Sequence, residues 1–360
     1  MCIFLNIMNF GLYHLSLSRA FINSPLISNR GDNYHVQLSC FSNFFKSLFD
    51  GHGSMKLNHC YLLKFLDKSI VLRSDYEEFS KKTYKHHLSY VNIENSWFDN
   101  VKSTSKGSAI ETNYYCFLIV KSCVFSNLYS PKEGGAIFHF GTESNISKCC
   151  FSSCYCGELK DSNSGGNIFS LNGNCRIYYC HAKECAPVTS KGGDSLYQLY
   201  DGLIMISEFN GTRNCTPNYG SIGGAFQNHN ENSTISFSIF TFSNDCVLFE
   251  SWNSIATLNK CNFINNTLKS CAIYSFQSTV YIKSCSFYGN SLKNTIGTVI
   301  FSESFTDYSV SGAIVTSTTL QSATGFSICK IDQDTPFYTS SSYNIPLQLL
   351  FILFSEYSCL

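Results

Sequence analysis

The chain of 360 residues carries 25 Lys or Arg and 25 Asp or Glu side chains, so its formal net charge is zero. A neutral chain has no overall field that would recruit nucleic acid or an acidic membrane surface. Charged residues make up only 14% of the sequence, and the 31 Phe and 22 Tyr residues favour strands over helices. The composition indicates neither a nucleic-acid partner nor a cofactor.

The first 90 residues show no clear internal period. The apolar segment 2–13 is interrupted by Asn6 and Asn9 and lacks a basic start, so it is a poor match to a secretory signal. If the rest of the chain is a solenoid, as the next segment indicates, its open end exposes strand edges that need protection. We therefore interpret residues 1–90 as an N-terminal cap or as degenerate coils.

Residues 91–320 repeat one short phrase: an aliphatic residue, two others, Cys or Ser, a spacer and usually Phe. Consecutive copies are 23 to 31 residues apart. Self-similarity at this period is typical of a stacked-repeat architecture. The Cys or Ser position is filled, in chain order, by Ser96, Cys123, Cys149, Cys180, Ser207, Ser238, Cys261 and Cys285.

Each repeat is consistent with one coil of three short strands. Gly-rich segments such as residues 134–137 (Gly-Gly-Ala-Ile) supply a turn before the first strand. Within the phrase, the aliphatic residue and the Cys or Ser are three positions apart, so both face inward only if the chain bends between them. The pattern predicts an all-β fold, a right-handed parallel β-helix with about eight or more coils.

The repeated cysteines favour an internal Cys/Ser ladder. A position that accepts Cys or Ser requires a small inward residue, and stacked side chains run parallel rather than toward each other, which disfavours disulfides there. A local disulfide such as Cys154 with Cys185 is expected if the chain is secreted. Zinc is disfavoured because no Cys-x-x-Cys motif occurs, although several possible ligands lie in two predicted adjacent coils. These are Cys149, Cys150, Cys154 and Cys156 in one coil and Cys180, His181 and Cys185 in the next.

The length of the repeat varies mainly between the Phe position and the next glycines. Insertions confined to one corner project from one side of a solenoid, and that side is often the binding face. Residues 152–164 and 210–222 are therefore the candidate recognition loops. The alternative is that they are unselected surface loops.

Residues 321–360 are interpreted as a C-terminal tail or cap. Segment 347–354 is apolar except for Gln348, but it is too short for a membrane span of about 20 residues. The sequence therefore predicts no transmembrane segment.

The alternation of Gly-Gly-Ala-Ile with Phe-x-x-Asn resembles the repeat of polymorphic outer-membrane proteins and related right-handed β-helix surface proteins. Residues 134–137, 263–266 and 287–290 match most closely, and the resemblance covers about residues 93–315. It implies cell-surface display and adhesion, without a catalytic set to carry over.

Right-handed β-helices also include pectin-cleaving enzymes, so a polysaccharide-active hydrolase or lyase is the alternative function. Gly51-His52-Gly53 resembles the Gly-His-Gly of polygalacturonases, but no motif supplies the paired carboxylates that glycoside hydrolysis uses. We predict no catalytic, cofactor-binding or metal-binding residue. A purely structural spacer is the third hypothesis.

Asn-x-Ser/Thr sequons indicate a secreted glycoprotein. We therefore predict a non-enzymatic extracellular or cell-surface protein that binds surface glycans or proteins through its corner loops. The candidate glycosylation sites, all at predicted turns or bends, are Asn145, Asn210, Asn214, Asn232 and Asn265.

Overall fold

The computed structural model describes most of the chain between residues 9 and 315. Within this part every assigned element is a β-strand, and no helix is long and apolar enough to cross a membrane. The described residues are 9–18, 25–26, 32–51, 53–72, 89–113, 116–157, 166–185, 195–214, 225–227, 232–244, 247–268, 271–291, 294–307 and 314–315.

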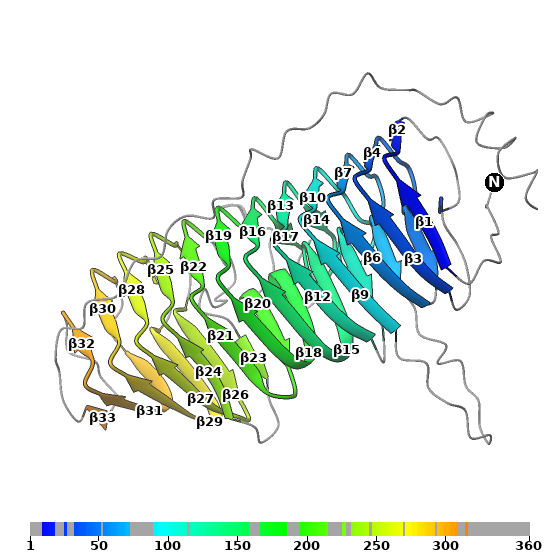
Figure 1. Ribbon diagram of the computed structural model, residues 1–360. Coiled ribbons are helices and arrows are strands. Elements are labelled where there is room, and N and C mark those ends of the chain that lie inside the picture. The colour runs from blue at the N-terminus through cyan, green and yellow to red at the C-terminus, as the bar shows by residue number, and fades with distance from the viewer. Residues whose placement is uncertain are drawn as a thin grey trace, which may run out of the picture.

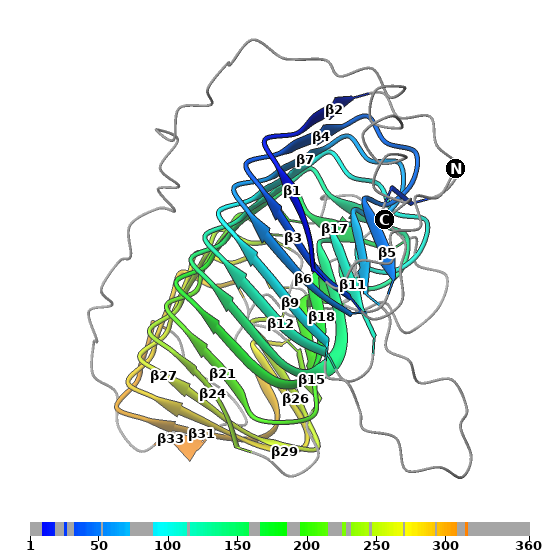
Figure 2. The same cartoon turned by 45° about the vertical axis from the view of Figure 1, so that its right-hand side comes forward.

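The strands wind into one elongated solenoid with three faces (Figure 1). Twelve short strands stack in chain order on the third face, one per coil, so the described residues form twelve stacked coils. The first and second faces belong to one sheet of 19 strands, because four strands run through the corner between them. Figure 2 shows the strands of the second face lying side by side along the axis. The predicted all-β parallel β-helix is confirmed.

The strand boundaries follow the three faces. The first face contains β5 (Phe49–Gly51), β8 (Ile70–Leu72), β11 (Ile110–Thr112), β20 (Ser195–Tyr200), β23 (Ala225–Gln227) and β26 (Phe249–Trp252). The second contains β1 (Asn9–Tyr13), β3 (Asp32–Gln37), β6 (Gly53–Asn58), β9 (Ser89–Glu94), β12 (Cys116–Lys121), β21 (Ile204–Ser207), β24 (Asn232–Ser236), β27 (Ile255–Asn259) and β33 (Ile314–Val315). The strands that run through the corner are β15 (Ile137–Ser147), β18 (Gly166–Tyr178), β29 (Ile273–Lys283) and β31 (Thr295–Ser302).

The third face is built from the shortest strands. They are β2 (Ser16–Ser18), β4 (Cys40–Ser42), β7 (Tyr61–Leu63), β10 (Trp97–Asp99), β13 (Val124–Ser126), β16 (Cys150–Ser152), β19 (His181–Lys183), β22 (Asn210–Thr212), β25 (Ile239–Thr241), β28 (Asn262–Ile264), β30 (Ser286–Tyr288) and β32 (Phe305–Thr306). A separate pair, β14 (Tyr129–Ser130) and β17 (Tyr155–Cys156), extends two neighbouring coils.

The core is a narrow tube filled by columns of side chains. Inward and outward residues alternate along each strand, as in β9, where buried Val91 and Ile93 alternate with outward Tyr90 and Asn92. Each coil thus buries its inner residues against its two neighbours. One buried aliphatic column on the second face comprises Ile93, Val120, Ile146, Ile177, Ile206, Ile235, Leu258 and Ile282.

Two of the bends in a coil are each made by one residue in the left-handed conformation. In one coil these are Asn95, with φ of 48°, and Asn100, with φ of 53°, which flank β10. Asn adopts this region more easily than most residues because its side chain bonds locally to the backbone. Most coils use other residues at the same positions, for example Lys148 and Tyr179, with φ of 53° and 55°.

The coils begin earlier than the repeat expected from the sequence. β3 pairs with β6 and β6 with β9 in the same parallel register that continues along the second face. Residues 36–41 carry the complete phrase, with Val36, Ser39 and Phe41 at its fixed positions. The described parts of residues 1–90 therefore form regular coils, whereas residues 321–360 lie outside the described part of the chain.

Candidate functional site

Seven of the eight predicted ladder residues are buried at one bend, between the second and third faces. Each of the side chains donates to the carbonyl two residues earlier, as Ser96 Oγ does to Glu94 O at 2.8 Å and Cys123 Sγ to Lys121 O at 3.2 Å. Hydroxyl and thiol both donate, so the position accepts Ser or Cys. The seven are Ser96, Cys123, Cys149, Cys180, Ser238, Cys261 and Cys285, and the structure adds Ser39, Cys60 and Ser304.

Ser207 does not belong to this ladder, which corrects the sequence prediction at that position. It ends β21 in register with Tyr178, and both side chains are half-exposed. The buried residue at the bend of this coil is Phe209. The prediction slipped by two positions because Ile204 matches the aliphatic position of the phrase as well as Ile206, which occupies the aliphatic column.

Phe209 fills a gap in the aromatic column of the third face. Ala182 and Gly211 take the Phe position in two adjacent coils, and a Cβ at Gly211 would lie only 2.9 Å from the Phe240 ring. The Phe209 ring lies 5.9 Å from Phe240 and 5.3 Å from Tyr197, so the stack continues through this region. On either side the stacked rings are Phe98, Phe125 and Phe151, then Phe240, Phe263 and Phe287.

Cys154 and Cys185 are free thiols, so the disulfide expected between them is not formed. Burial raises the pKa of Cys154 well above its ordinary value and raises the pKa of Cys175 to about 12. A buried neutral thiol is a poor nucleophile and a poor metal ligand. Within the described ranges, no group of three or more His, Cys, Asp or Glu side chains is placed to hold a metal ion.

A second internal ladder lies at the bend after the third face. The backbone N–H of Ser243 donates to Asn266 Oδ1 at 3.0 Å, and that of Asn266 donates to Asn290 Oδ1 at 3.0 Å. Asn266 Nδ2 also donates to the carbonyl of Phe240 at 3.0 Å. These buried amides satisfy backbone groups that no strand partner reaches.

The candidate glycosylation sites occupy different environments. Asn232 and Asn265 are exposed, and Asn210 is half-exposed at the start of β22. Asn145 lies half-buried within β15, and Asn210 and Asn232 are the first residues of β22 and β24. The expectation that all five sites lie at turns or bends is therefore wrong for these three residues.

Asn214 is part of the second ladder and is only 1% exposed. Its Oδ1 accepts from the backbone N–H of Cys185 at 2.9 Å, and its Nδ2 donates to Ala182 O at 3.2 Å. A glycan on Nδ2 would break this buried network, so Asn214 is incompatible with glycosylation in this fold.

The candidate recognition loops lie partly outside the described residues, which exclude 158–165 and 215–224. Their described beginnings, 152–157 and 210–214, continue the third face and the bend after it. His52 of the Gly-His-Gly match also lies outside the described residues.

A groove of about 570 Å³ lies on the outer side of the second face, across β1, β3, β6 and β9. Its floor includes the buried residues Tyr34 and Met55. The described residues that line it are Gly11, Tyr13, Asn33, Tyr34, His35, Ser54, Met55, Lys56, Tyr90 and Asn92, and none of these is a carboxylate.

One end of the groove is formed by an aromatic pair. The Tyr13 ring covers Gly11, where an added Cβ would lie 2.5 Å from the ring. Tyr13 OH is 3.3 Å from His35 Nδ1, and the two rings meet edge to face at 5.5 Å. The Tyr13 side chain is nevertheless 51% exposed, so it stands out from the sheet as a wall.

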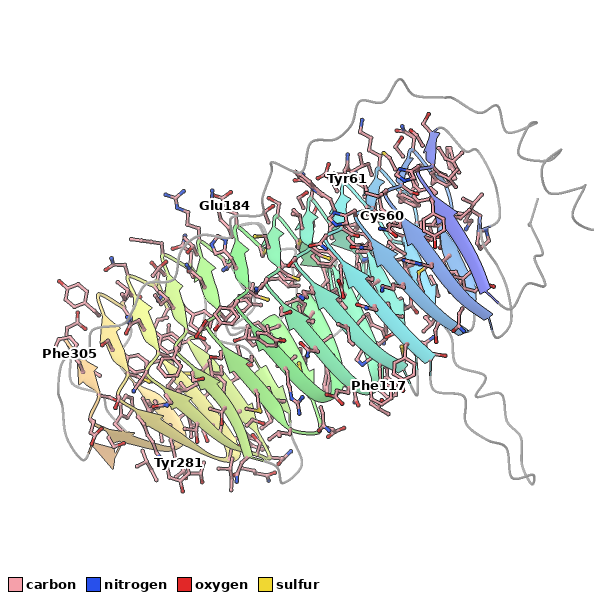
Figure 3. All side chains as sticks on the ribbon, in the orientation of Figure 1. Cys60, Tyr61, Phe117, Glu184, Tyr281 and Phe305 are labelled. Atoms are coloured by element: carbon pink, nitrogen blue, oxygen red, sulfur yellow. The ribbon has the colours of Figure 1, made fainter. Side chains whose placement is uncertain are left out.

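The opposite end of the groove is formed by Tyr90, which is 48% exposed. Its ring stacks on Phe117 of the next coil, with centroids 5.1 Å apart and planes at 11°. The backbone N–H of Tyr90 donates to Ser54 Oγ at 3.2 Å, which ties the wall to the neighbouring coil. Figure 3 shows Phe117 along the lower edge of the molecule, on the opposite side from Tyr61.

The centre of the groove is polar. His35, Lys56 and Asn92 lie in register in adjacent coils, with Lys56 in the middle. His35 Nε2 and Asn92 Oδ1 are covered by neighbouring atoms and have no hydrogen-bond partner in the described part of the chain. The arrangement offers aromatic faces at both ends and several polar groups between them, which is typical of a small-ligand site.

Sequence reasoning did not find this groove. Its walls and centre come from outward positions of four coils, and outward residues carry no repeating pattern. Tyr13 and Tyr90 could have indicated a binding site, but only once the pairing of β1, β3, β6 and β9 is known, because this pairing shows that both rings lie on one face.

A second group of exposed aromatic residues lies on the first face, in the C-terminal coils. Trp252 lies 5.3 Å from Tyr274 and 5.0 Å from Phe276, ring centroid to ring centroid. The Phe276 side chain is 42% exposed. Because this group lies on another face, a substitution in it can serve as a control for substitutions in the aromatic walls of the groove.

No family model matches the chain, and no curated protein matches it. Among solved structures it is similar to the A-module of the mannuronan C-5 epimerase AlgE6 from Azotobacter vinelandii, with 6% identity and a TM-score of 0.22. That similarity covers 86% of this chain and 91% of the other. A likeness at this level carries no argument about function.

Proposed function

We propose that the protein is a non-enzymatic glycan-binding solenoid, secreted or displayed at a cell surface, and that the groove on its second face holds a short stretch of a carbohydrate chain. The observation that carries the proposal is the open groove between the exposed rings of Tyr13 and Tyr90.

The chemistry of the lining fits a carbohydrate. The C–H-bearing face of a pyranose ring packs on an aromatic side chain, and Tyr combines such a face with a polar end. Amide, hydroxyl, imidazole and ammonium groups between the two walls match sugar hydroxyls. Adjacent coils are about 4.8 Å apart, so the four strands span roughly 14 Å, enough for an oligosaccharide rather than one small metabolite.

One feature supports binding rather than catalysis, and a second supports a location outside the cell. The described residues of the groove lining include no carboxylate, whereas glycosidases use a pair of them, which favours binding over catalysis. Three sequons, at Asn210, Asn232 and Asn265, remain accessible or partly accessible on the folded solenoid, as glycosylation in a secretory pathway requires.

The test is a glycan array followed by equilibrium binding of the best ligand to the wild-type protein and to Tyr90→Ala. We expect the substitution to weaken binding about tenfold, because loss of an aromatic contact costs about 1.4 kcal/mol. Phe276→Ala is the matched control, since it removes a ring of similar exposure, 42% against 48%, from another face.

Each other outcome favours a different hypothesis. Tight glycan binding that Tyr90→Ala leaves unchanged, but that deletion of residues 158–164 abolishes, would move the site to the corner loops. Release of reducing sugars or unsaturated products from a bound polysaccharide would favour the enzyme. Failure to bind any glycan would overturn the proposal and favour the hypothesis that the protein is a purely structural spacer.

A further inference from the structure

We propose that Asn265 carries an N-linked glycan, and that the first sugars of this glycan cover Phe242 and Tyr288, the two most exposed aromatic side chains in the described part of the chain. The inference rests on the secreted or surface location proposed above, but not on the groove. It assigns a modification to one sequon and gives the modification a role, which is to shield apolar surface of the C-terminal coils.

The backbone of Asn265 is fixed while its side chain is left outside the core. The residue lies at the bend that follows β28, with φ of 53°, and its N–H donates to Tyr288 O of the next coil at 2.8 Å. Its side chain is exposed. The buried position of the second ladder is filled by the next residue, Asn266, so the core does not require the amide of Asn265.

The lack of a side chain at Gly289 makes room for the Asn265 amide. Gly289 occupies the same bend position in the next coil, and a Cβ there would collide with Asn265 Oδ1. The amide oxygen therefore leans over Gly289, and Nδ2 lies farther from that backbone. The Asn265 side chain has no hydrogen-bond partner among the described residues, so Nδ2 is available to carry a sugar.

The modification is a glycosyl transfer from a lipid-linked oligosaccharide of the secretory pathway. Nδ2 of Asn265 loses a proton and bonds to the anomeric carbon of the first sugar, while the bond from that carbon to the lipid diphosphate breaks and the lipid diphosphate leaves. Asn265-Asn266-Thr267 supplies the acceptor sequence. The folded chain accommodates the product at this exposed position, whereas Asn214, which is 1% exposed, leaves no space for it.

The sequon lies between the two exposed rings. Phe242, 53% exposed, has the same bend position in the preceding coil, and Tyr288, 55% exposed, ends β30 in the next coil. Coils are about 4.8 Å apart, so the two side chains start about 10 Å apart with Asn265 between them. The C–H-bearing face of a sugar packs on such rings, and removing their apolar surface from water is favourable.

The shielded surface and the groove lie toward opposite ends of the solenoid. Figure 1 shows β25, β28 and β30 side by side in the C-terminal coils, whereas the groove crosses β1, β3, β6 and β9. A glycan on Asn265 therefore leaves the groove open to its own ligand.

The first measurement is site occupancy. The full chain is expressed in a secretory host that makes only high-mannose glycans, and the purified protein is digested with trypsin. The peptide of residues 261–269 contains Asn265 as its only sequon residue. Release of the glycan by an amidase in heavy-oxygen water converts a modified Asn to labelled Asp, and we expect this label at Asn265 and not at Asn214.

The second measurement is the thermal midpoint of the intact protein, after trimming to a single N-acetylglucosamine and after complete removal of the glycans. We expect the single sugar to preserve the midpoint and complete removal to lower it by about 2 °C, as loss of one aromatic contact does in a chain of this length. Asn265→Gln, measured in the same way, gives the share that belongs to the other sequons. Phe242→Ala and Tyr288→Ala should abolish the Asn265 share, whereas Phe276→Ala, an exposed ring on another face, should retain it.

An unmodified Asn265 in protein that carries glycans at Asn210 or Asn232 would overturn this inference and leave the proposed location intact. Retention of the chain inside the cell without any glycan would overturn the proposed location as well. An unchanged midpoint after complete removal, or a loss that persists in Phe242→Ala and Tyr288→Ala, would overturn the shielding. So would a dimer of the fully glycosylated protein that Tyr288→Ala dissociates, because a second copy would then cover the rings.

Discussion

At the scale of single residues, the bends of this solenoid depend on left-handed backbone conformations at residue types from which the sequence does not predict them. Lys148, Tyr179 and Phe242 all adopt the left-handed region, with φ between 53° and 55°. Such a conformation costs roughly 1–2 kcal/mol for most residues. The surrounding coils impose it, because the N–H of each such residue bonds a carbonyl of the next coil, as Lys148 N does to Tyr178 O at 3.1 Å.

His139 is the residue whose burial has the clearest consequence for stability. It is 1% exposed on β15, and its Nδ1 lies 2.6 Å from Thr112 Oγ1. Burial lowers its pKa from 6.5 to about 4. The unfolded chain therefore binds a proton on this residue between about pH 6.5 and pH 4, whereas the folded chain does not.

His139 should therefore make the protein sensitive to acid. Its contribution is fully present above pH 6.5 and is lost as the pH falls toward 4, by about 3 kcal/mol in total. We expect the free energy of unfolding in urea to fall more between pH 7 and pH 4.5 for wild type than for His139→Gln. An identical decrease in the two proteins would show that other groups cause the acid sensitivity.

At the scale of elements, the ladder at the bend after the third face should matter more than any single exposed contact. Asn266→Ala removes the acceptor of the Ser243 N–H and the donor to the Phe240 carbonyl, and leaves both groups buried. Each unsatisfied group costs about 1–3 kcal/mol. We expect a loss of about 3 kcal/mol in the free energy of unfolding, measured by chemical denaturation.

The control for this prediction is Asn259→Ala, at the end of β27, where the side chain projects outward and is half-exposed. A change below about 0.5 kcal/mol is expected there. Equal losses at the two positions would mean that the buried network contributes little beyond ordinary surface contacts.

At the level of elements, the sequence predicted the strands and bends of the coils that carry the repeated phrase. It did not predict the coil in which another residue takes the place of the phrase. Three-residue spacing between aliphatic and Cys/Ser positions predicts the bend between the second and third faces, and the structure has that bend in each coil. The same phrase fails at Ser207, because the coil with Gly211 fills its core with Phe209 instead. Core volume is conserved across neighbouring coils, whereas a motif search treats each coil separately.

At the scale of the whole molecule, the tube shields its thiols. Cys60, Cys116 and Cys175 are buried, and burial raises the pKa of Cys60 to about 11 and those of Cys116 and Cys175 to about 12. Cys40, on the outer side of β4, is half-exposed. Alkylation requires an accessible thiolate, so the native fold should leave most of these cysteines unmodified.

We expect iodoacetamide at pH 8 to label Cys40 in the native protein while Cys60, Cys116 and Cys175 remain unmodified, as determined by peptide mass spectrometry. In denaturant all four should react at similar rates. Native labelling of Cys116 as fast as Cys40 would contradict a closed, tightly stacked tube.

The overall architecture could be predicted because period alone specifies a stacked fold, whatever the outward residues are. The groove could not, because its lining comes from residues 11–92, the region where the repeat is least visible in the sequence. Lys56 and Asn92 become neighbours only through the register of β6 and β9, and a single-residue slip of either strand would turn its own groove residue inward.

The confinement of the groove to the first four coils has a consequence for how such a protein can change. Each coil rests only on the one before and the one after, so gain or loss of whole turns near the far end alters reach in increments of about 4.8 Å. Such a gain or loss of coils would not change the residues that line the groove. Length and ligand preference are therefore separately adjustable properties of this architecture.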